Sequence, residues 1–207
     1  MDATRQYLTM EGLPAARRTA VPAPGPRAFR RGNEYRLLMD ALVLLRDLAS
    51  RPRHAADALR GRLDPAVLAA HPGGHPNSVA WLLWHTGREI DAQLAALTGE
   101  DEVWETRGIA KQLGLGEEGA AVGYGHTPEQ ARAIEVTDGE ALLDYVEAAL
   151  DAFDFHLAGV TFADLDDIVD EAWDPPVTRA ARLVSILDDA IQHLAQAAYV
   201  LGMPQRG

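Results

Sequence analysis

The chain has 207 residues, of which 47% are hydrophobic, and it carries 31 acidic against 19 basic side chains, for a net charge of −12 at pH 7. This content of apolar residues excludes a disordered chain and suits one domain with a single core. Because cysteine is absent, disulfides, thiolate metal ligands and a cysteine nucleophile are excluded. Any metal would therefore have nitrogen and oxygen ligands.

The distribution of charged and apolar residues bears on partners and location. Residues 1–31 hold six arginines against two acidic residues, so the rest of the chain is still more acidic and is not suited to bind nucleic acid. No stretch approaches the ~18–20 consecutive apolar residues of a membrane helix, and the N-terminus lacks the apolar core of a signal peptide. We expect a cytoplasmic protein that acts on a small molecule without a membrane or nucleic-acid partner. An acidic helical chain of this size also suits a homodimer.

Residues 1–32 have the composition of an extension. They are rich in proline and arginine and show no sustained hydrophobic period. We expect this segment to lie on the acidic surface of the remaining chain, residues 33–207. The alternative is that its arginines hold an acidic partner or an anionic substrate.

The first predicted helix begins at Asn33, which is a suitable cap, and it follows apolar residues spaced three and four apart. We expect it to end near residues 51–53, where Pro52 interrupts the pattern, and to resume through Leu63. A turn-rich stretch at 64–76 then separates it from the next helix. The two histidines beside the Gly-Gly pair of this stretch are interpreted as turn residues, since two ligands without a carboxylate make a poor metal site.

The same spacing predicts three further helices. They span about residues 78–98, 138–158 and 178–201. A glycine-rich connection over 100–137 separates the second helix from the third, and connections of this length are commonly functional or mobile. We therefore predict an all-α fold, a four-helix bundle with an N-terminal extension and a long connection between helices two and three. The segment 163–169 fits either a helical turn or an extended piece.

The fourth predicted helix carries the strongest candidate for chemistry. Asp189 and His193 are four positions apart, so their side chains lie only about 40° apart around the helix, one turn from each other. Asp188 points roughly 140° away from His193, and we expect it to be solvated. Because Asp189 and His193 interrupt an apolar stripe, their burial costs several kcal/mol unless a partner compensates.

The second predicted helix supplies another polar group within an apolar run, His85. If the two helices are neighbours, His85, Asp189 and His193 can meet as three ligands of one divalent metal. Three protein ligands leave positions open for water or substrate, which is typical of a catalytic site. Two imidazoles and a carboxylate suit Zn²⁺ or Ni²⁺ and would also hold Fe²⁺ or Mn²⁺. The alternative is an ordinary ion pair between Asp189 and His193, with His85 hydrogen-bonded separately in the core.

Further polar residues leave alternatives open. Glu89 fits a fourth ligand, a base or a pair for Arg88. His156 fits either a neighbour of the site or a partly exposed residue at a helix end. Tyr124 and His126 lie in the long connection, which either folds over the mouth of the site or stays flexible.

Two runs of residues carry a resemblance to a known family. The second-helix signature of the DinB/YfiT-like superfamily has an Asn-Ser start and an apolar run that leads to a metal-binding histidine, and it resembles the run from Asn77 to His85. That superfamily's fourth-helix pattern, His, three residues, His and then Gly-Gln, is similar to the run from Asp189 through His193 to Gln196. The resemblance covers about residues 35–203 and implies a DinB-like bundle with its metal on His85, Asp189 and His193.

The chain departs from this pattern at two positions. Asp189 stands where the pattern has histidine, and Ala195 stands where it has glycine. The mycothiol-dependent maleylpyruvate isomerases of the superfamily have a carboxylate, glutamate, at the first of these positions. A carboxylate ligand is therefore compatible with the family, although aspartate is shorter by one methylene.

The resemblance implies a divalent-metal-dependent enzyme, a thiol-dependent transferase or isomerase that uses a low-molecular-weight thiol. In this hypothesis Gln196 orients a ligand or the bound nucleophile. The ratio of 18 arginines to one lysine is typical of a GC-rich coding sequence. Such a bias points to an actinobacterium, in which mycothiol would be the thiol. The alternative is a non-catalytic metal-binding or stress-associated bundle protein, and a metal-dependent hydrolase is a third hypothesis.

Overall fold

Four long helices form the frame of the computed structural model, which describes residues 41–203. They are α1 (Ala41–Asp57), α3 (Val79–Thr98), α8 (Gly139–Gly159) and α9 (Arg179–Leu201). The prediction of an all-α four-helix bundle is confirmed, whereas the extension 1–32 and the helix start at Asn33 lie outside the described residues. In the part of the chain that is described, none of the helices has the length and apolar character needed to span a bilayer.

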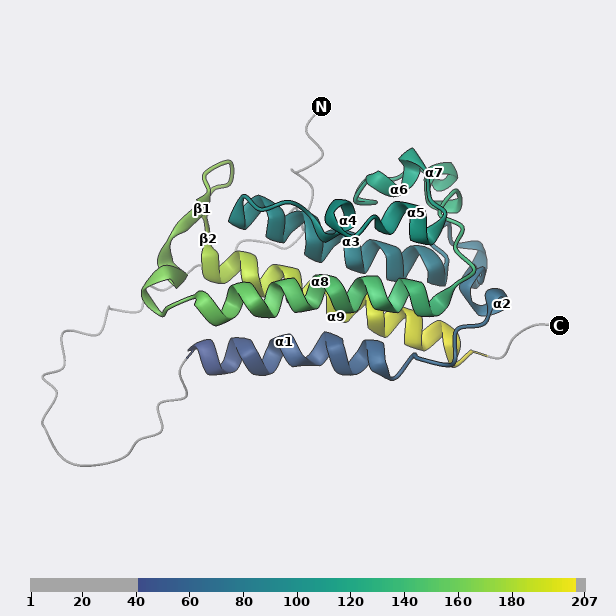
Figure 1. The fold of residues 1–207 in the computed structure, drawn as a ribbon, viewed down its shortest axis with the longest axis horizontal. Helices are drawn as coiled ribbons and strands as arrows, with labels where there is room; N and C mark the ends of the chain where they lie inside the picture. The colour runs from purple at the N-terminus through teal and green to yellow at the C-terminus, as the bar shows by residue number, and fades with distance from the viewer. Residues whose placement is uncertain (1–40, 204–207) are drawn as a thin grey trace, which may run out of the picture. The chain divides into compact units, whose positions relative to one another are not determined.

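The four long helices do not alternate in direction (Figure 1). Helices α3 and α8 run the same way, and α1 and α9 run the opposite way. Both α3 and α1 pack against α8 and α9. Because α3 and α8 are parallel, the chain must return along the whole bundle between them, and a short loop cannot do this. The predicted long connection between the second and third helices is thus a crossover.

The crossover is folded against the bundle. It contains four short helices, α4 (Val103–Thr106), α5 (Ile109–Leu113), α6 (Glu117–Ala120) and α7 (Pro128–Arg132). Trp104, Ile109 and Ile134 are buried within it and belong to the core. The alternative of a flexible loop is therefore wrong, because these side chains would lose their burial if the segment detached.

The other connections are shorter. Helix α2 (Pro65–Leu68) and the 3-10 helix η2 (Pro72–Gly74) join α1 to α3, while η3 (Ala163–Asp166), β1 (Ile168–Asp170) and β2 (Val177–Thr178) join α8 to α9. The two strands are antiparallel, with Ile168 opposite Thr178 and Asp170 opposite Val177. The segment 163–169 therefore contains a helical turn followed by a short strand.

Helix α1 passes through Pro52 to its end at Asp57, so the predicted interruption is wrong. A proline inside a helix removes one hydrogen bond and crowds the preceding turn, at a cost of about 3 kcal/mol. Pro52 is buried on the same stripe as Leu45, and the next residue, Arg53, donates to Asp154 of α8 at 3.0 Å. The packing of α1 against α8 and α9 therefore outweighs the local cost.

The ends of the other long helices agree with their predicted bounds to within a residue. Ser78, Asp138 and Thr178 cap α3, α8 and α9, and each side-chain oxygen accepts a hydrogen bond from the backbone N–H three residues later. Gly99 ends α3 with a φ of +77°, a left-handed conformation that costs glycine little. Local sequence is sufficient to set these bounds.

Helix α3 is the most buried element, with buried residues on all of its faces. Within residues 41–203, the buried polar or charged side chains other than those of tyrosine and tryptophan belong to α3 or to its N-cap. These are Ser78, His85, Thr86, Arg88, Glu89 and Asp91. Burying a charge costs several kcal/mol unless the charge is paired. A functional site is therefore expected at the buried polar side chains of α3.

Candidate metal centre

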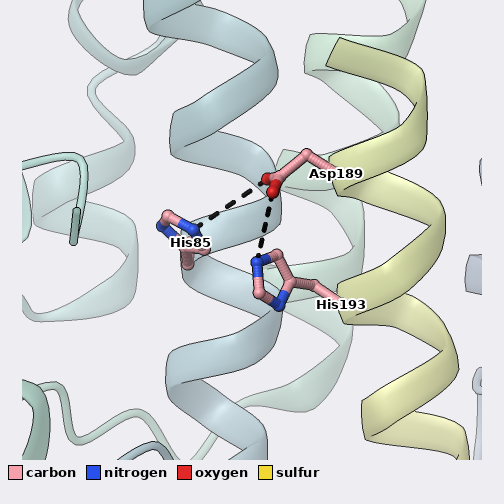
Figure 2. A group of neighbouring side chains, drawn as sticks. All are labelled: His85, Asp189 and His193. Carbon is pink, nitrogen blue, oxygen red and sulfur yellow. Dashed lines mark ion pairs between the residues drawn. The ribbon is translucent and has the colours of Figure 1, made fainter. Parts of the chain in front are cut away.

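Two histidines and an aspartate from α3 and α9 meet inside the bundle (Figure 2). The Nε2 atom of His85 lies 4.0 Å from Oδ2 of Asp189, and Nε2 of His193 lies 3.5 Å from Oδ1 of the same carboxylate. One ligand atom from each residue lies within 4.8 Å of the other two, and residues 41–203 contain no other such group of three. The structure thus brings together the three residues that the sequence predicts as ligands.

The helical phase of α9 directs Asp189, and not Asp188, towards this group. Asp189 is largely buried, whereas Asp188 is exposed and accepts a hydrogen bond from Nε2 of Gln192 at 2.8 Å. The expected solvation of Asp188 is confirmed. His193 follows Asp189 by one turn and therefore lies on the same face.

Hydrogen bonds on the outer ring nitrogens orient both imidazoles. Nδ1 of His85 lies 2.5 Å from the backbone oxygen of Val122, and Nδ1 of His193 lies 2.9 Å from Oε1 of Gln196. A carbonyl oxygen only accepts, so each neutral ring donates from Nδ1 and keeps a lone pair on Nε2. Both Nε2 atoms face the carboxylate of Asp189 (Figure 2). Metal-binding histidines are commonly held in this way.

The carboxylate of Asp189 contains a buried atom that no hydrogen bond satisfies. Its Oδ2 atom has no partner and faces Nε2 of His85. An unsatisfied buried acceptor costs on the order of 1–3 kcal/mol, and more when it is charged. A cation between Oδ2 of Asp189 and Nε2 of His85 would give this oxygen a partner. The donor set of two nitrogens and a carboxylate therefore fits a divalent metal.

The two histidines hold a proton to different extents. Burial lowers the pKa of His85 to about 4, against the smaller opposing effect of the Val122 carbonyl, so this ring is neutral at pH 7. Burial also acts to lower the pKa of His193, but the hydrogen bond and charge of Asp189 outweigh it, and the net shift of the pKa is upward. His85 therefore offers its lone pair at neutral pH, whereas a proton competes with a cation for His193.

Aromatic rings line one side of the group of three. The indole of Trp81 stacks on His85 with the ring centroids 4.5 Å apart, and it meets His193 edge-on at 6.1 Å. Its Nε1 atom donates to Nδ1 of His126, whose ring stacks on Trp84 at 5.6 Å. The crossover thus packs against the α3 side of the site, while its closing over the mouth of the site stays a prediction. The one-turn spacing between Trp81 and His85 is the sequence signal for this wall.

Glu89 lies one turn after His85 on α3 but outside the group of three. Its side chain is buried, and burial together with the charge of Asp189 raises the pKa of Glu89 to about 7. Gln93 donates from Nε2 to this carboxylate, and its Oε1 accepts a hydrogen bond from Arg182 at 3.0 Å. Glu89 is thus a carboxylate held beside the site by a chain of hydrogen bonds.

Arg88 is a buried charge that no sequence pattern reveals. It is 3% exposed and pairs with Glu102 at 2.6 Å, so the alternative that it pairs with Glu89 is wrong. Its guanidinium also lies over Trp104, 4.9 Å from the ring centroid. The sequence gives no sign that Arg88 is buried, because this face of α3 is covered only through the central position of the helix in the fold.

Three other candidate histidines lie away from the site. His156, near the end of α8, has a buried Nε2 without a hydrogen-bond partner, and burial with the charge of Arg179 lowers its pKa. Arg179 precedes Asp189 by ten residues, or about 15 Å of helix, so the alternative that His156 neighbours the site is wrong. Nδ1 of His71 bonds to the backbone oxygen of His75 at 2.8 Å, so these two are turn residues, as interpreted.

Comparisons with known proteins agree with this fold. The crystal structure of a conserved protein of a locus from Enterococcus faecalis has 32% sequence identity and a TM-score of 0.64, over 78% of this chain and 92% of that one. The curated proteins contain no match. The sequence profile of the DinB superfamily matches residues 49–197, which are more than half of the chain and include all three members of the site. The chain therefore belongs to the DinB superfamily, as the resemblance of its second and fourth helices predicted.

Proposed function

We propose that this chain is a divalent-metal-dependent enzyme that transfers or isomerises its substrate with the help of a low-molecular-weight thiol. The observation that carries the proposal is the buried Oδ2 of Asp189, which has no hydrogen-bond partner and lies 4.0 Å from Nε2 of His85. An ordinary structural ion pair would place a donor there. The choice of thiol rests on the resemblance to the mycothiol-dependent isomerases, and mycothiol is the cosubstrate we propose.

His85, Asp189 and His193 would hold the metal. Two imidazoles and a carboxylate suit Zn²⁺ or Ni²⁺ best, and Fe²⁺ or Mn²⁺ also fits. When bound, a divalent cation with three protein ligands lowers the pKa of a thiol or water at an open position and so supplies a nucleophile at neutral pH. The chain has no cysteine of its own for this purpose.

The chain's own residues would prepare the site for this chemistry. His85 presents its Nε2 lone pair because its other ring nitrogen donates to a carbonyl. Trp81 covers that ring and excludes water, which strengthens the electrostatic interactions inside. Glu89, buried one turn after His85 and with its pKa raised to about 7, would hold the proton released as the nucleophile forms. Gln196 is expected to orient His193, and through it the bound nucleophile.

Metal analysis of protein made without an affinity tag tests the site. After exposure to Zn²⁺ or Ni²⁺ and dialysis, we expect about one ion per chain, and none in His85→Ala or His193→Ala. His156→Ala is the matched control, because it removes a partly buried histidine outside the site and should leave the metal content unchanged. A wild-type protein without metal, or full retention in both ligand variants, would contradict the proposal.

The use of a thiol is tested separately on the Co²⁺-loaded protein. Addition of glutathione or mycothiol should produce a sulfur-to-cobalt charge-transfer band in the near ultraviolet, and His193→Ala should not show it. A screen of thiol conjugation beside ester hydrolysis then assigns the reaction. Metal binding without either activity would favour a non-catalytic metal-binding protein, and hydrolysis that needs no thiol would favour a metal-dependent hydrolase.

A further inference from the structure

Side chains of α3 hold four consecutive carbonyl groups of the crossover, those of residues 119–122. Trp84 donates from Nε1 to the first of them at 3.2 Å. Arg88 donates from Nη2 to the second at 3.0 Å and from Nε to the third at 3.1 Å. His85 donates from Nδ1 to the fourth at 2.5 Å. This short piece of backbone is therefore fastened to one face of α3, by residues that lie within about one turn of each other.

We propose that Arg88 is a positioning residue of the metal centre, which holds the carbonyls of Ala120 and Ala121 and thereby places the carbonyl of Val122 on Nδ1–H of His85. The inference rests on the proposed metal site but concerns a residue outside it. Arg88 touches none of the three ligands and acts on His85 only through this backbone.

The shape of the guanidinium suits Arg88 to this task. Its donors lie in one plane in a fixed arrangement, so it can satisfy two successive carbonyls and the carboxylate of Glu102 at once. Contact with the ring of Trp104 and near-complete burial leave it little freedom to move. An apolar side chain of similar volume would pack α3 without the cost of burying a charge. The fixed set of donors is what the arginine adds.

The next residue, Gly123, shows that this backbone has no room to shift towards the imidazole. It has a φ of +96°, and a Cβ atom there would lie 2.9 Å from Nδ1 of His85 and 2.8 Å from the ring of Trp84. Both the conformation and the close approach require glycine. The crossover is therefore in direct contact with the ring, and its placement decides where the acceptor for Nδ1–H lies.

Without that acceptor, His85 has a competing state. A neutral imidazole can carry its proton on either nitrogen, and a proton on Nε2 would point at the unsatisfied Oδ2 of Asp189, 4.0 Å away. A small approach of the two side chains would complete that hydrogen bond. That tautomer satisfies the carboxylate but removes the lone pair that a metal needs. By fixing the acceptor on the other side of the ring, Arg88 would select the tautomer that is competent to bind metal.

The test compares Arg88→Lys and Arg88→Met with the matched control Arg60→Met. Arg60 is likewise an arginine paired with acidic side chains, Asp57 of α1 and Glu140, Asp144 and Glu147 of α8. It makes no hydrogen bond to residues 119–122. In metal-free protein, ¹⁵N NMR of the imidazole rings reports which nitrogen carries the proton. We expect the Nδ1–H tautomer at His85 in the wild type and the control, and a large share of the Nε2–H tautomer in both Arg88 variants.

Affinity for Zn²⁺, measured by competition with a chromophoric chelator, is the second readout. It should fall about 10–100-fold in the Arg88 variants, the range found for residues that support metal ligands, and should not change in the control. Circular dichroism checks that each variant keeps its helical content. If Arg88→Met does not fold, Arg88→Lys, which keeps the positive charge, decides whether Arg88 positions His85.

Two results would overturn the inference. One is a folded Arg88→Lys protein that retains the Nδ1–H tautomer at His85. The other is a changed tautomer with unchanged affinity for Zn²⁺. A wild type that binds no Zn²⁺ would instead overturn the proposed function, and the tautomers would still decide whether Arg88 positions His85.

Discussion

The two walls of the candidate metal centre are built differently. On the α9 wall, Asp189, His193 and Gln196 belong to one helix, and their contacts span three or four residues. On the α3 wall, the imidazole of His85 depends on the carbonyl of Val122, 37 residues later in the chain. The α9 wall is local and partly exposed, whereas the α3 wall is buried and non-local.

This difference teaches where each wall is vulnerable. Helix geometry alone sets the spacing of the α9 wall, and water can replace an exposed hydrogen-bond partner there. The α3 wall keeps its geometry only while the crossover stays folded, and a buried group that loses its partner has no water to replace it. We therefore expect comparable changes to cost more on the α3 wall than on the α9 wall.

The largest effect is expected at Asp189, because this residue contacts both walls. Asp189→Asn keeps the shape of the side chain but removes its charge, so we expect affinity for Zn²⁺ to fall more than about 100-fold, beyond the loss for a supporting residue. Asp188→Asn is the matched control on the solvated face and should leave the affinity unchanged. Equal losses in the two variants would show that α9 has another helical phase.

A second large effect is expected in the pH dependence of stability, through Glu89. Burial and Asp189 raise the pKa of Glu89 from 4.5 to about 7. Between these pH values the unfolded chain has lost this proton while the folded protein retains it, so stability falls as the pH rises. Relative to Glu89→Gln, the unfolding free energy of metal-free wild type should fall on the order of 3 kcal/mol across this window.

Urea denaturation of both proteins at several pH values measures this difference. His85 has a lowered pKa, so its own contribution is lost in the opposite direction, as the pH falls from 6.5 towards about 4. That contribution is present in both proteins and largely cancels in the comparison. A difference between wild type and Glu89→Gln that stays constant with pH would contradict the prediction.

Gln196 allows a direct comparison of the two walls. Gln196→Ala removes the acceptor of Nδ1–H on His193, but water can take its place because Gln196 is exposed. We expect affinity for Zn²⁺ to fall no more than about 10-fold, and less than in Arg88→Lys. The chelator competition assay measures both. If Gln196→Ala lost more affinity for Zn²⁺ than Arg88→Lys, the α9 wall would be the more vulnerable one.

The smallest effect is expected for an arginine that lies on neither wall. Arg53 pairs with Asp151 at 2.9 Å and with Asp154 at 3.0 Å on the outer face of α8. Such partly exposed pairs contribute up to about 1 kcal/mol and are screened by salt. Arg53→Met should lower the unfolding free energy by about that amount at low salt and by less at high salt. A loss of several kcal/mol in Arg53→Met would contradict the view that a partly exposed arginine matters less than a buried one such as Arg88.

The α9 wall was predictable because the spacing of Asp189 and His193 is a property of the helix itself. His85 was predictable as a polar residue within an apolar run. Arg88 and Val122 were not, since the hydrogen bonds that make them important join residues more than 30 positions apart. Pro52 shows the same limit, because its local preference to end a helix gives way to the packing of α1 against α8 and α9.

By itself the sequence determined four helices and the ends of three of them, a chain without thiol ligands, and the common direction of Asp189 and His193. The absence of thiol ligands follows from composition, and the other features depend on interactions within about four residues of the chain. Only the tertiary structure decided that α3 and α8 run parallel and that the crossover returns over His85 and Arg88. The physical reason is that the burial of a charge, and the choice of partner for a buried donor, depend on which distant segments pack together.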